Sequence, residues 1–268
     1  MKSFKYIIAF LILGVFLFSS MKVKEPNNET ISSSSSKHEI VLATWNVGHF
    51  SNGGKSYSTI GPKQYNDKVK GFRKILYDSL SADLIGINEY SAIFGKSKSG
   101  KESLSSEILF NKFEYKNEGK KSWICNSIFS NIDVYNVKRF FYKNTISNVF
   151  NYLSADIFID GEKVQMIYVH LTSRDTKQRS KQMKELIEKY KNYKRIIIFG
   201  DFNLRPRFMK AFKDDGYILA NDGSLITFPS KSIAIDNILV KGLKISDVRV
   251  VKTDLSDHYP LVCRISIK

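Results

Sequence analysis

The sequence predicts an α/β (α+β) fold in which two mixed β-sheets pack face to face, with helices outside them. Short apolar runs rich in β-branched residues recur along the chain, and each is typical of a buried strand. Amphipathic helical segments lie between several of these runs. The hairpin dipeptide Asp160-Gly161 joins two central strands, which argues against a purely alternating parallel sheet.

The N-terminal segment is expected to lie outside this fold. Two lysines precede the apolar run Tyr6–Phe18, which is typical of a secretory signal and short for a membrane-spanning helix. We expect residues 1–20 to be a signal peptide, or alternatively an uncleaved membrane anchor. Either one predicts a protein exported from the cytoplasm: secreted, periplasmic or membrane-tethered. The polar, Ser-rich residues 21–38 predict a flexible tether, which leaves 39–268 as one domain.

The first half of this domain begins with an apolar strand, Glu39–Asn46. An amphipathic helix is predicted over Lys63–Ala82, because Val69, Phe72, Leu76 and Leu80 form one stripe. A second buried strand follows at Leu84–Tyr90. The Lys/Ser/Glu-rich stretch after it predicts a helix near Ser103–Phe113, and Trp123–Ser130 is a further strand.

The second half alternates strands with one long helix, whose apolar face carries Met183, Leu186, Ile187 and Tyr190. A fully apolar strand ends just before Gly200. If the alternation of the strand continues, Phe202 is expected to point back into the core. The expected elements are strands at Asn136–Asn144 and Tyr152–Leu171 (a hairpin whose last strand ends at His170), a helix at Arg174–Tyr193, and strands at Ile196–Phe199, Ala234–Val240 and His258–Ile267.

Charge and cysteine content leave two questions open. The net charge of +16, from 42 Lys+Arg against 26 Asp+Glu, favours an anionic partner such as nucleic acid or an acidic membrane. A chain rich in Lys, Asn, Ile and Ser is equally explained by biased codon usage, so charge alone decides nothing. Cys125 and Cys263 are expected to be buried free thiols, although one disulfide is compatible with an exported protein.

Polar residues recur at the ends of the predicted strands. A single Asp or His at a strand end is usually a turn former or a cap, but sheet folds collect their functional sites at strand ends, and six repetitions are hard to dismiss. The set is Asn46, Glu89, His170, Asp201 with Asn203, Asp236, and Asp257 with His258.

The chemistry of this set is coherent. Carboxylate and amide oxygens suit Mg²⁺ or Mn²⁺, and the absence of a Cys/His cluster in the sequence argues against zinc. Histidines beside carboxylates suit proton transfer and stabilisation of an anion. The sequence therefore predicts metal-assisted attack of water on a phosphoester.

Six motifs in order resemble the endonuclease/exonuclease/phosphatase family, to which deoxyribonuclease I, exonuclease III and the neutral sphingomyelinases belong. They are "TWNV", "INEY", "HL" followed by "RSKQ", "GDFN", "IDNILV" and "SDHYPLV". The resemblance covers nearly the whole domain, Val41–Ile267. It implies a deoxyribonuclease I-like four-layer sandwich: two packed mixed sheets flanked by helices.

The resemblance also implies a role for each strand-end residue. Asn46, Glu89 and Asp257 would hold Mg²⁺ (or Mn²⁺), with Glu89 the principal carboxylate. Asp201 and Asn203 would position the attacking water. The remaining implied roles are general base for His258, orientation of that base for Asp236, phosphate binding for His170, and support of the substrate site for Asn126.

Some residues depart from the family pattern or stay outside the predicted site. Asn88 replaces the usual Gln before the metal-binding glutamate, and Cys125 replaces a Gly, but neither change removes a catalytic group. We expect Arg179 and Gln182 to fix a helix to the sheet. The remaining candidates are His49, interpreted as a loop residue, His38, which lies in the tether, and Lys138–Lys143, interpreted as a plain strand rather than a surface that stacks bases or enters a membrane.

These expectations combine into an exported, Mg²⁺-dependent phosphoesterase that hydrolyses phosphodiester bonds. Basic charge and export favour a nuclease on DNA or RNA, acting as a monomer. A sphingomyelinase-like or phosphoinositide activity at a membrane surface is the alternative. A non-catalytic anion-binding module is a second alternative, but such a module is expected to lack one of His258, Asp201 and Glu89, and all three are present.

Overall fold

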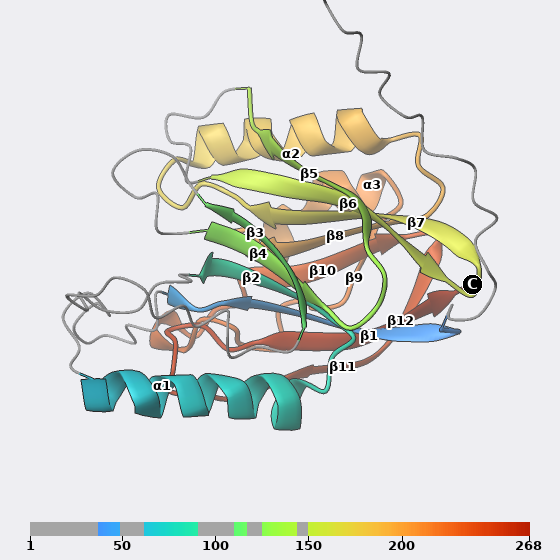
Figure 1. Cartoon of the computed structure of the whole chain (residues 1–268). Coiled ribbons are helices and arrows are strands. Elements are labelled where there is room, and N and C mark those ends of the chain that lie inside the picture. The colour runs from blue at the N-terminus through green and yellow to red at the C-terminus, as the bar shows by residue number, and fades with distance from the viewer. Residues whose placement is uncertain (1–36, 49–61, 91–109, 117–124, 144–149) are drawn as a thin grey trace, which may run out of the picture. The chain divides into compact units, whose positions relative to one another are not determined.

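Two six-stranded mixed sheets lie face to face, and helices cover both outer faces (Figure 1). This computed structural model describes residues 37–48, 62–90, 110–116, 125–143 and 150–268. The predicted four-layer sandwich is therefore confirmed.

The first sheet has the strand order β11-β12-β1-β2-β4-β3, and the second has the order β5-β6-β7-β8-β10-β9. Both are mixed, because β1 pairs with β2 and β7 with β8 in parallel, whereas the other pairs are antiparallel. The strands of the first sheet are β1 (Glu39–Asn46), β2 (Leu84–Tyr90), β3 (Asn111–Lys116), β4 (Cys125–Ser130), β11 (Leu243–Val250) and β12 (Leu261–Ile267). Those of the second are β5 (Tyr135–Phe141), β6 (Asn151–Ile159), β7 (Glu162–His170), β8 (Ile196–Asp201), β9 (Ile218–Leu219) and β10 (Asp236–Lys241).

Helices α1 (Pro62–Lys74) and α2 (Thr176–Tyr190) lie on opposite outer faces (Figure 1). A π-helical segment, η3 (Ile75–Leu80), continues α1. Helix α2 begins at Asp175, whose side chain accepts hydrogen bonds from the first backbone N–H groups, as expected of an N-cap. The short elements are η6 (Pro206–Phe208), α3 (Lys210–Asp214) and η7 (Pro229–Lys231).

Three apolar layers hold the sandwich together. The α1–η3 stripe packs on the outer face of the first sheet, a second layer fills the space between the sheets, and α2 with α3 covers the second sheet. Strand β8 serves two of these layers at once, since Ile196 and Ile198 face the helices whereas Ile197 and Phe199 face the other sheet. Four consecutive buried apolar residues therefore fix the position of the strand end that follows them.

The strands and helices predicted from apolar runs are confirmed, including the hairpin at Asp160-Gly161 and the inward position of Phe202. One expectation differs from the structure. The helix predicted near Ser103–Phe113 is wrong at its end, because Asn111–Phe113 lie in strand β3, while 103–109 fall outside the described residues. The structure also contains two strands that were not predicted, β9 and β11.

The start of the described chain is bonded to the domain. The Lys37 backbone oxygen accepts from Asp160 N–H at 2.8 Å, the Lys37 ammonium pairs with Asp83, and the His38 ring lies 2.6 Å from Asp160. Residues Ser35–Lys268 form one compact unit. The predicted signal or anchor, and the tether up to residue 36, lie outside the described residues.

Two further observations concern membrane insertion and the thiols. Among the described residues, no helix combines the length and apolar character that crossing a bilayer requires. Cys263 is a buried free thiol, as predicted, and burial raises its pKa to about 12. The side chain of Cys125 lies outside the described part of the structure.

Candidate active site

The predicted strand-end residues meet at one edge of the sandwich. Parallel strands deliver their carboxyl ends to the same edge, and the pairing places Asn46 beside Asn88 and His170 beside Asp201. Strand β10 runs the other way, so its first residue, Asp236, pairs with Asp201. Asp201 therefore lies between His170 and Asp236 in the second sheet, opposite the ends of β1 and β2.

His258 and Asp236 form a buried hydrogen-bonded pair. The His258 Nδ1 lies 2.8 Å from Asp236 Oδ2, and both side chains are at least nine-tenths buried. The loop before β12 positions the imidazole. The His258 backbone N–H donates to Ser256 Oγ, and the His258 backbone oxygen accepts from Trp45 Nε1. The centres of the Phe228 and His258 rings are 4.8 Å apart. When Nδ1 carries the proton and donates a hydrogen bond to the Asp236 carboxylate, Nε2 is left available for proton transfer.

Asp201 is buried, and its two carboxylate oxygens are held by different partners. Oδ2 accepts from the Asn46 amide at 3.0 Å, and Oδ1 accepts from the Asn203 N–H at 2.7 Å. Burial, and then the neighbouring Asp236 carboxylate, raise the pKa of Asp201 from 3.8 to about 7; the His258 charge and the two hydrogen bonds oppose that rise. A carboxylate in this environment favours a proton or a cation beside it.

Glu89 and His170 complete the group around Asp201. The His170 Nε2 lies 3.7 Å from Glu89 Oε1 and 3.8 Å from Asp201 Oδ2, and the Asn46 amide reaches Glu89 at 3.4 Å. Glu89 is the more exposed carboxylate, with 26% of its side chain accessible. It has φ +53° and Asn203 has φ +50°, backbone conformations that side-chain-bearing residues seldom adopt and that concentrate at functional sites.

The donor set fits a hard divalent cation. Asp201, Asp236 and His258 offer ligand atoms within 4.8 Å of one another, but Asp236 and His258 already bond to each other. Glu89 Oε1 and Asp201 Oδ2 both lie near His170 Nε2 and the Asn46 amide, so these two oxygens face one point and are the better candidates for cation ligands. Asp236 Oδ1 is buried and has no hydrogen-bond partner among the described residues, so this oxygen is free to accept from a further donor or to contact a cation.

The three carboxylates also act on the imidazole. Burial lowers the pKa of His258, but Asp236, Asp201 and Asp257 raise it by more than burial lowers it, so that it reaches about 10. A general base must be neutral to accept a proton, so neutralisation of the surrounding carboxylates is required before His258 serves as a base near neutral pH.

Two predicted metal ligands have positions that limit that role. The Asn46 side-chain oxygen, Oδ1, accepts from Gly48 N–H at 2.9 Å, so it is the side-chain NH₂ that faces Glu89 and Asp201. Asp257 lies on the His258 side, where its Oδ1 is 3.3 Å from Ser256 Oγ and close to Gly48. The predicted role of each in metal binding stays a prediction.

Asn126 lies beneath the site in a chain of buried amides. Its oxygen accepts from Asn88 Nδ2 at 3.0 Å, and its nitrogen donates to Asn151 Oδ1 at 3.0 Å. Asn88 in turn accepts from the Asp201 N–H at 3.0 Å and donates to the Val169 oxygen, so it ties β2 to the ends of β7 and β8. Asn126 has 1% of its surface exposed and is hydrogen-bonded on both sides, and its predicted role in the substrate site stays a prediction.

Arg179 and Gln182 have the structural role that was predicted for them. Arg179 donates to the Thr172 and Ser173 oxygens, and Gln182 accepts from Thr172 N–H. Helix α2 is thereby fixed to the loop that follows His170. His49 falls outside the described residues, and His38 lies at the other end of the β6–β7 hairpin, against Asp160.

Several supporting residues had no recognisable signal in the sequence. Thr227 Oγ1 accepts from the Ile235 and Asp236 N–H groups, and Ser256 Oγ donates to the Asn46 backbone oxygen at 2.7 Å. Their positions depend on contacts between segments far apart in the chain. The one available clue was Asn88, noted as a departure from the family pattern without any role.

Comparisons with known proteins bear on the fold of the chain. No protein-family model matches the sequence, and no curated protein matches it. Solved structures do match: D. rerio TDP2 complexed with a single-strand DNA product (16% identity, 85% of this chain and 98% of that chain, TM-score 0.62) and an endonuclease/exonuclease/phosphatase from Bacteroides vulgatus (15%, 87% and 100%, 0.64). A third is the human Nocturnin catalytic domain with a bound sulfate anion (15%, 87% and 95%, 0.62). At these identities the likeness shows that the chain has the endonuclease/exonuclease/phosphatase fold.

Proposed function

We propose that this chain is an exported phosphodiesterase that depends on a divalent cation, with Mg²⁺ as the first candidate, and that its substrate is nucleic acid. One observation carries the proposal: buried Asp201 lies between His170 and the His258–Asp236 pair, with Glu89 and Asn46 opposite it. The fold shared with solved endonuclease/exonuclease/phosphatase structures supports the reaction class.

Each side chain has a task in this proposal. Asp236 holds the imidazole of His258 so that Nε2 takes a proton from the attacking water. Asp201 and Asn203 orient that water, and His170 donates to a phosphate oxygen, where negative charge develops. A cation held by Glu89 and Asp201 would add electrostatic stabilisation of the same developing charge.

Nucleic acid is the substrate class that the charge favours. The net charge of +16 suits a polyanion, and one structure of similar fold contains a single-strand DNA product. Export rests on the lysines and apolar run at the N-terminus, and N-terminal sequencing of the protein recovered outside the cytoplasm tests it.

The test offers the full-length protein plasmid DNA, an RNA oligonucleotide, sphingomyelin vesicles and bis(4-nitrophenyl) phosphate, with Mg²⁺ or with EDTA. We expect metal-dependent cleavage of nucleic acid and of the small diester. Cleavage of lipid alone would replace the nuclease with a lipid phosphodiesterase. No turnover of any substrate would leave an anion-binding module.

Two histidine variants calibrate the assay. His258→Ala should lower the rate by several orders of magnitude while Mg²⁺ binding persists, because the base is lost and the proposed ligands stay. His38→Ala is the matched control, since His38 is exposed and bonds only to Asp160 in the described structure. A loss below about tenfold, ~1.4 kcal/mol, in His258→Ala would remove His258 from the base role.

A further inference from the structure

Two loops leave the candidate active site side by side. One follows His170 at the end of β7, and the other follows Asp201 at the end of β8. Leu171 N–H donates to the Asp201 backbone oxygen at 2.9 Å, and Asn203 Nδ2 donates to the Leu171 oxygen at 2.9 Å. These bonds join the loops where they begin, so both loops start at the same edge of the site.

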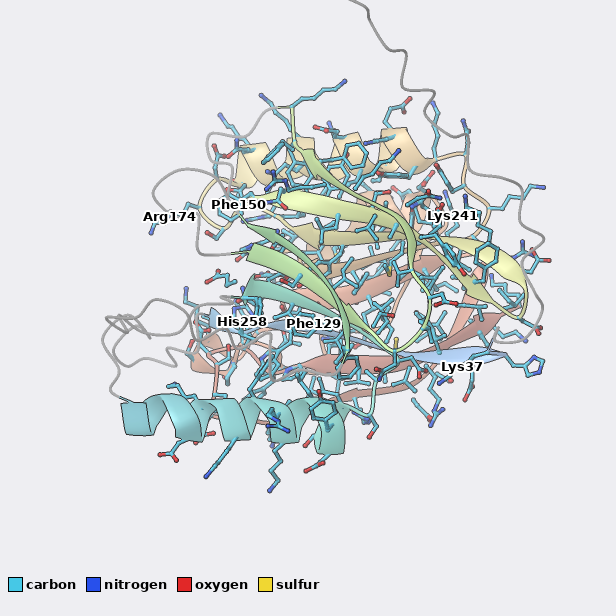
Figure 2. All side chains as sticks on the ribbon, viewed as in Figure 1. Lys37, Phe129, Phe150, Arg174, Lys241 and His258 are labelled. Carbon is cyan, nitrogen blue, oxygen red and sulfur yellow. The ribbon has the colours of Figure 1, made fainter. Side chains whose placement is uncertain are left out.

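Both loops carry arginines a few residues after they leave the site. Arg174 lies four residues after His170, and Arg205 lies four residues after Asp201, followed by Arg207; all three side chains are exposed. Within the described ranges none of the three has an ion-pair partner, and no acidic residue occurs from position 202 to 213. Figure 2 shows Arg174 at the same end of the sheets as His258. Asp175 directly follows Arg174, but the three guanidinium groups still outnumber the carboxylates in these two segments, which favours a ligand with several phosphates.

Phe208 is an exposed aromatic residue in the loop that follows β8. It is 55% exposed, the highest value among the large apolar side chains in the described part of the chain. A 3₁₀ turn fixes it: Phe208 N–H donates to the Arg205 oxygen at 2.9 Å, and the next N–H donates to the oxygen of buried Pro206. The Arg207 guanidinium lies 4.7 Å from the ring centre. The turn thus fixes the backbone that carries the ring, and a cation lies over one face of the ring.

We propose that Arg174, Arg205, Arg207 and Phe208, here called the strand-end rim, bind the single-stranded polynucleotide next to the reacting phosphodiester. This inference rests on the proposed function and names its substrate class more closely. The guanidinium groups contact backbone phosphates, and the Phe208 ring stacks on a base. We assign a single strand because a base inside a duplex is stacked on both faces and has none left for Phe208.

Distance and surroundings support this assignment. Phe208 is five residues from Asn203, so the two are at most about 18 Å apart, within reach of a few nucleotides. A bilayer contact would require a cluster of apolar side chains. The exposed Ile218 does not supply one, because β9 pairs with Leu239 and Val240, the end of β10 remote from Asp236.

The first test measures cleavage of a single-stranded oligonucleotide. Phe208→Ala should lower kcat/KM roughly 5- to 150-fold, because stacking on one base contributes about 1–3 kcal/mol. The loss should disappear when an abasic nucleotide replaces the stacked base, found by moving the abasic position along the strand. Tyr193→Ala is the matched control: Tyr193 is 40% exposed but precedes β8, at the opposite end of that strand from Asp201.

The second test measures how salt weakens binding of the same oligonucleotide to the full-length protein in EDTA, by fluorescence anisotropy. Arg174→Ala and Arg205→Ala should each reduce the slope of log K against log salt by about 0.7, the value for one phosphate contact on a single strand. Lys194→Ala, which removes an exposed cation beyond the C-terminal end of α2, should leave the slope unchanged.

The outcomes separate this inference from the proposed function. Absence of turnover by the unchanged protein would contradict the proposed function, whereas the salt dependence of oligonucleotide binding would still test the strand-end rim. Unchanged slopes, or a Phe208→Ala loss that is equal on bis(4-nitrophenyl) phosphate, overturn the rim assignment even in an active nuclease. Weaker binding of Phe208→Ala to sphingomyelin vesicles, with unchanged oligonucleotide binding, would make the rim a membrane contact and overturn it as well.

Discussion

Replacing Asp201 by Asn should stabilise the metal-free protein at pH 8. The pKa of Asp201 is raised by burial and by Asp236 from 3.8 to about 7. A raised pKa means that the folded chain binds the proton more tightly than the unfolded chain does. The resulting stability is full below about pH 4 and is lost as the pH rises to 7. The ionised side chain therefore costs on the order of 4 kcal/mol at pH 8, as an upper bound.

The expected gain is smaller than that bound. The Asn46 amide donates to Asp201 Oδ2, and an amide at position 201 can offer an acceptor to only one of the present donors, Asn46 and Asn203 N–H. We expect about 2 kcal/mol, which raises Tm by roughly 4–8 °C for a domain of this size.

Thermal denaturation in EDTA at pH 4 and pH 8 measures this. The advantage of Asp201→Asn should be large at pH 8 and shrink toward pH 4, and in a separate assay with Mg²⁺ this variant should be inactive. Asp214→Asn is the control, because it removes only an exposed pair with Lys210 on α3, worth ~0.3–0.5 kcal/mol. A lower Tm than the unchanged protein at pH 8, or an advantage independent of pH, would refute the reasoning.

Three other substitutions test the site and its support. Glu89→Gln should raise the Mg²⁺ concentration for half-maximal turnover at least about tenfold, ~1.4 kcal/mol, with partial recovery in excess metal; an unchanged metal titration would remove Glu89 from the ligands. Asn88→Ala leaves the buried Asp201 N–H without its acceptor and should lower stability by about 3 kcal/mol, whereas a Tm shift below about 2 °C would contradict the inter-sheet role. Gly86→Ala places a Cβ 2.2 Å from a Tyr168 ring carbon between the sheets and should cost about 1–3 kcal/mol by overpacking; an unaltered Tm would show that the ring moves freely.

The sequence predicted the parts of the fold that are buried on both sides. Strands β2 and β8 are continuous apolar runs, and their ends matched the structure to within two residues. Strand β11 escaped prediction because it alternates exposed and half-buried residues and is interrupted at Asp247, where φ is +50° and the register shifts. Strand β3, Asn111–Lys116, is an edge strand in which charged residues alternate with only two apolar ones, Phe113 and Tyr115, and this short alternation was overlooked beside the Lys/Ser/Glu-rich stretch before it.

The site was predictable as a set of residue types, but its supporting contacts were not. Strand ends with Asp or His carry a local signal, since an apolar run points to each of them. The amide chain through Asn88 and Asn151 and the hydroxyl of Thr227 join segments that are distant in sequence. Which donor meets which acceptor there depends on how the two sheets pack, and a single sequence contains no record of that packing.

A double-mutant cycle on the His258–Asp236 pair tests the central claim most directly. Asp236 is argued to act only through the imidazole that it orients at 2.8 Å. Turnover of bis(4-nitrophenyl) phosphate with saturating Mg²⁺ should therefore fall about as far in Asp236→Asn/His258→Ala as in His258→Ala alone, because residues that act as a unit are not additive. Losses that multiply in the double variant would show that the two side chains work independently, and the site as described would be wrong.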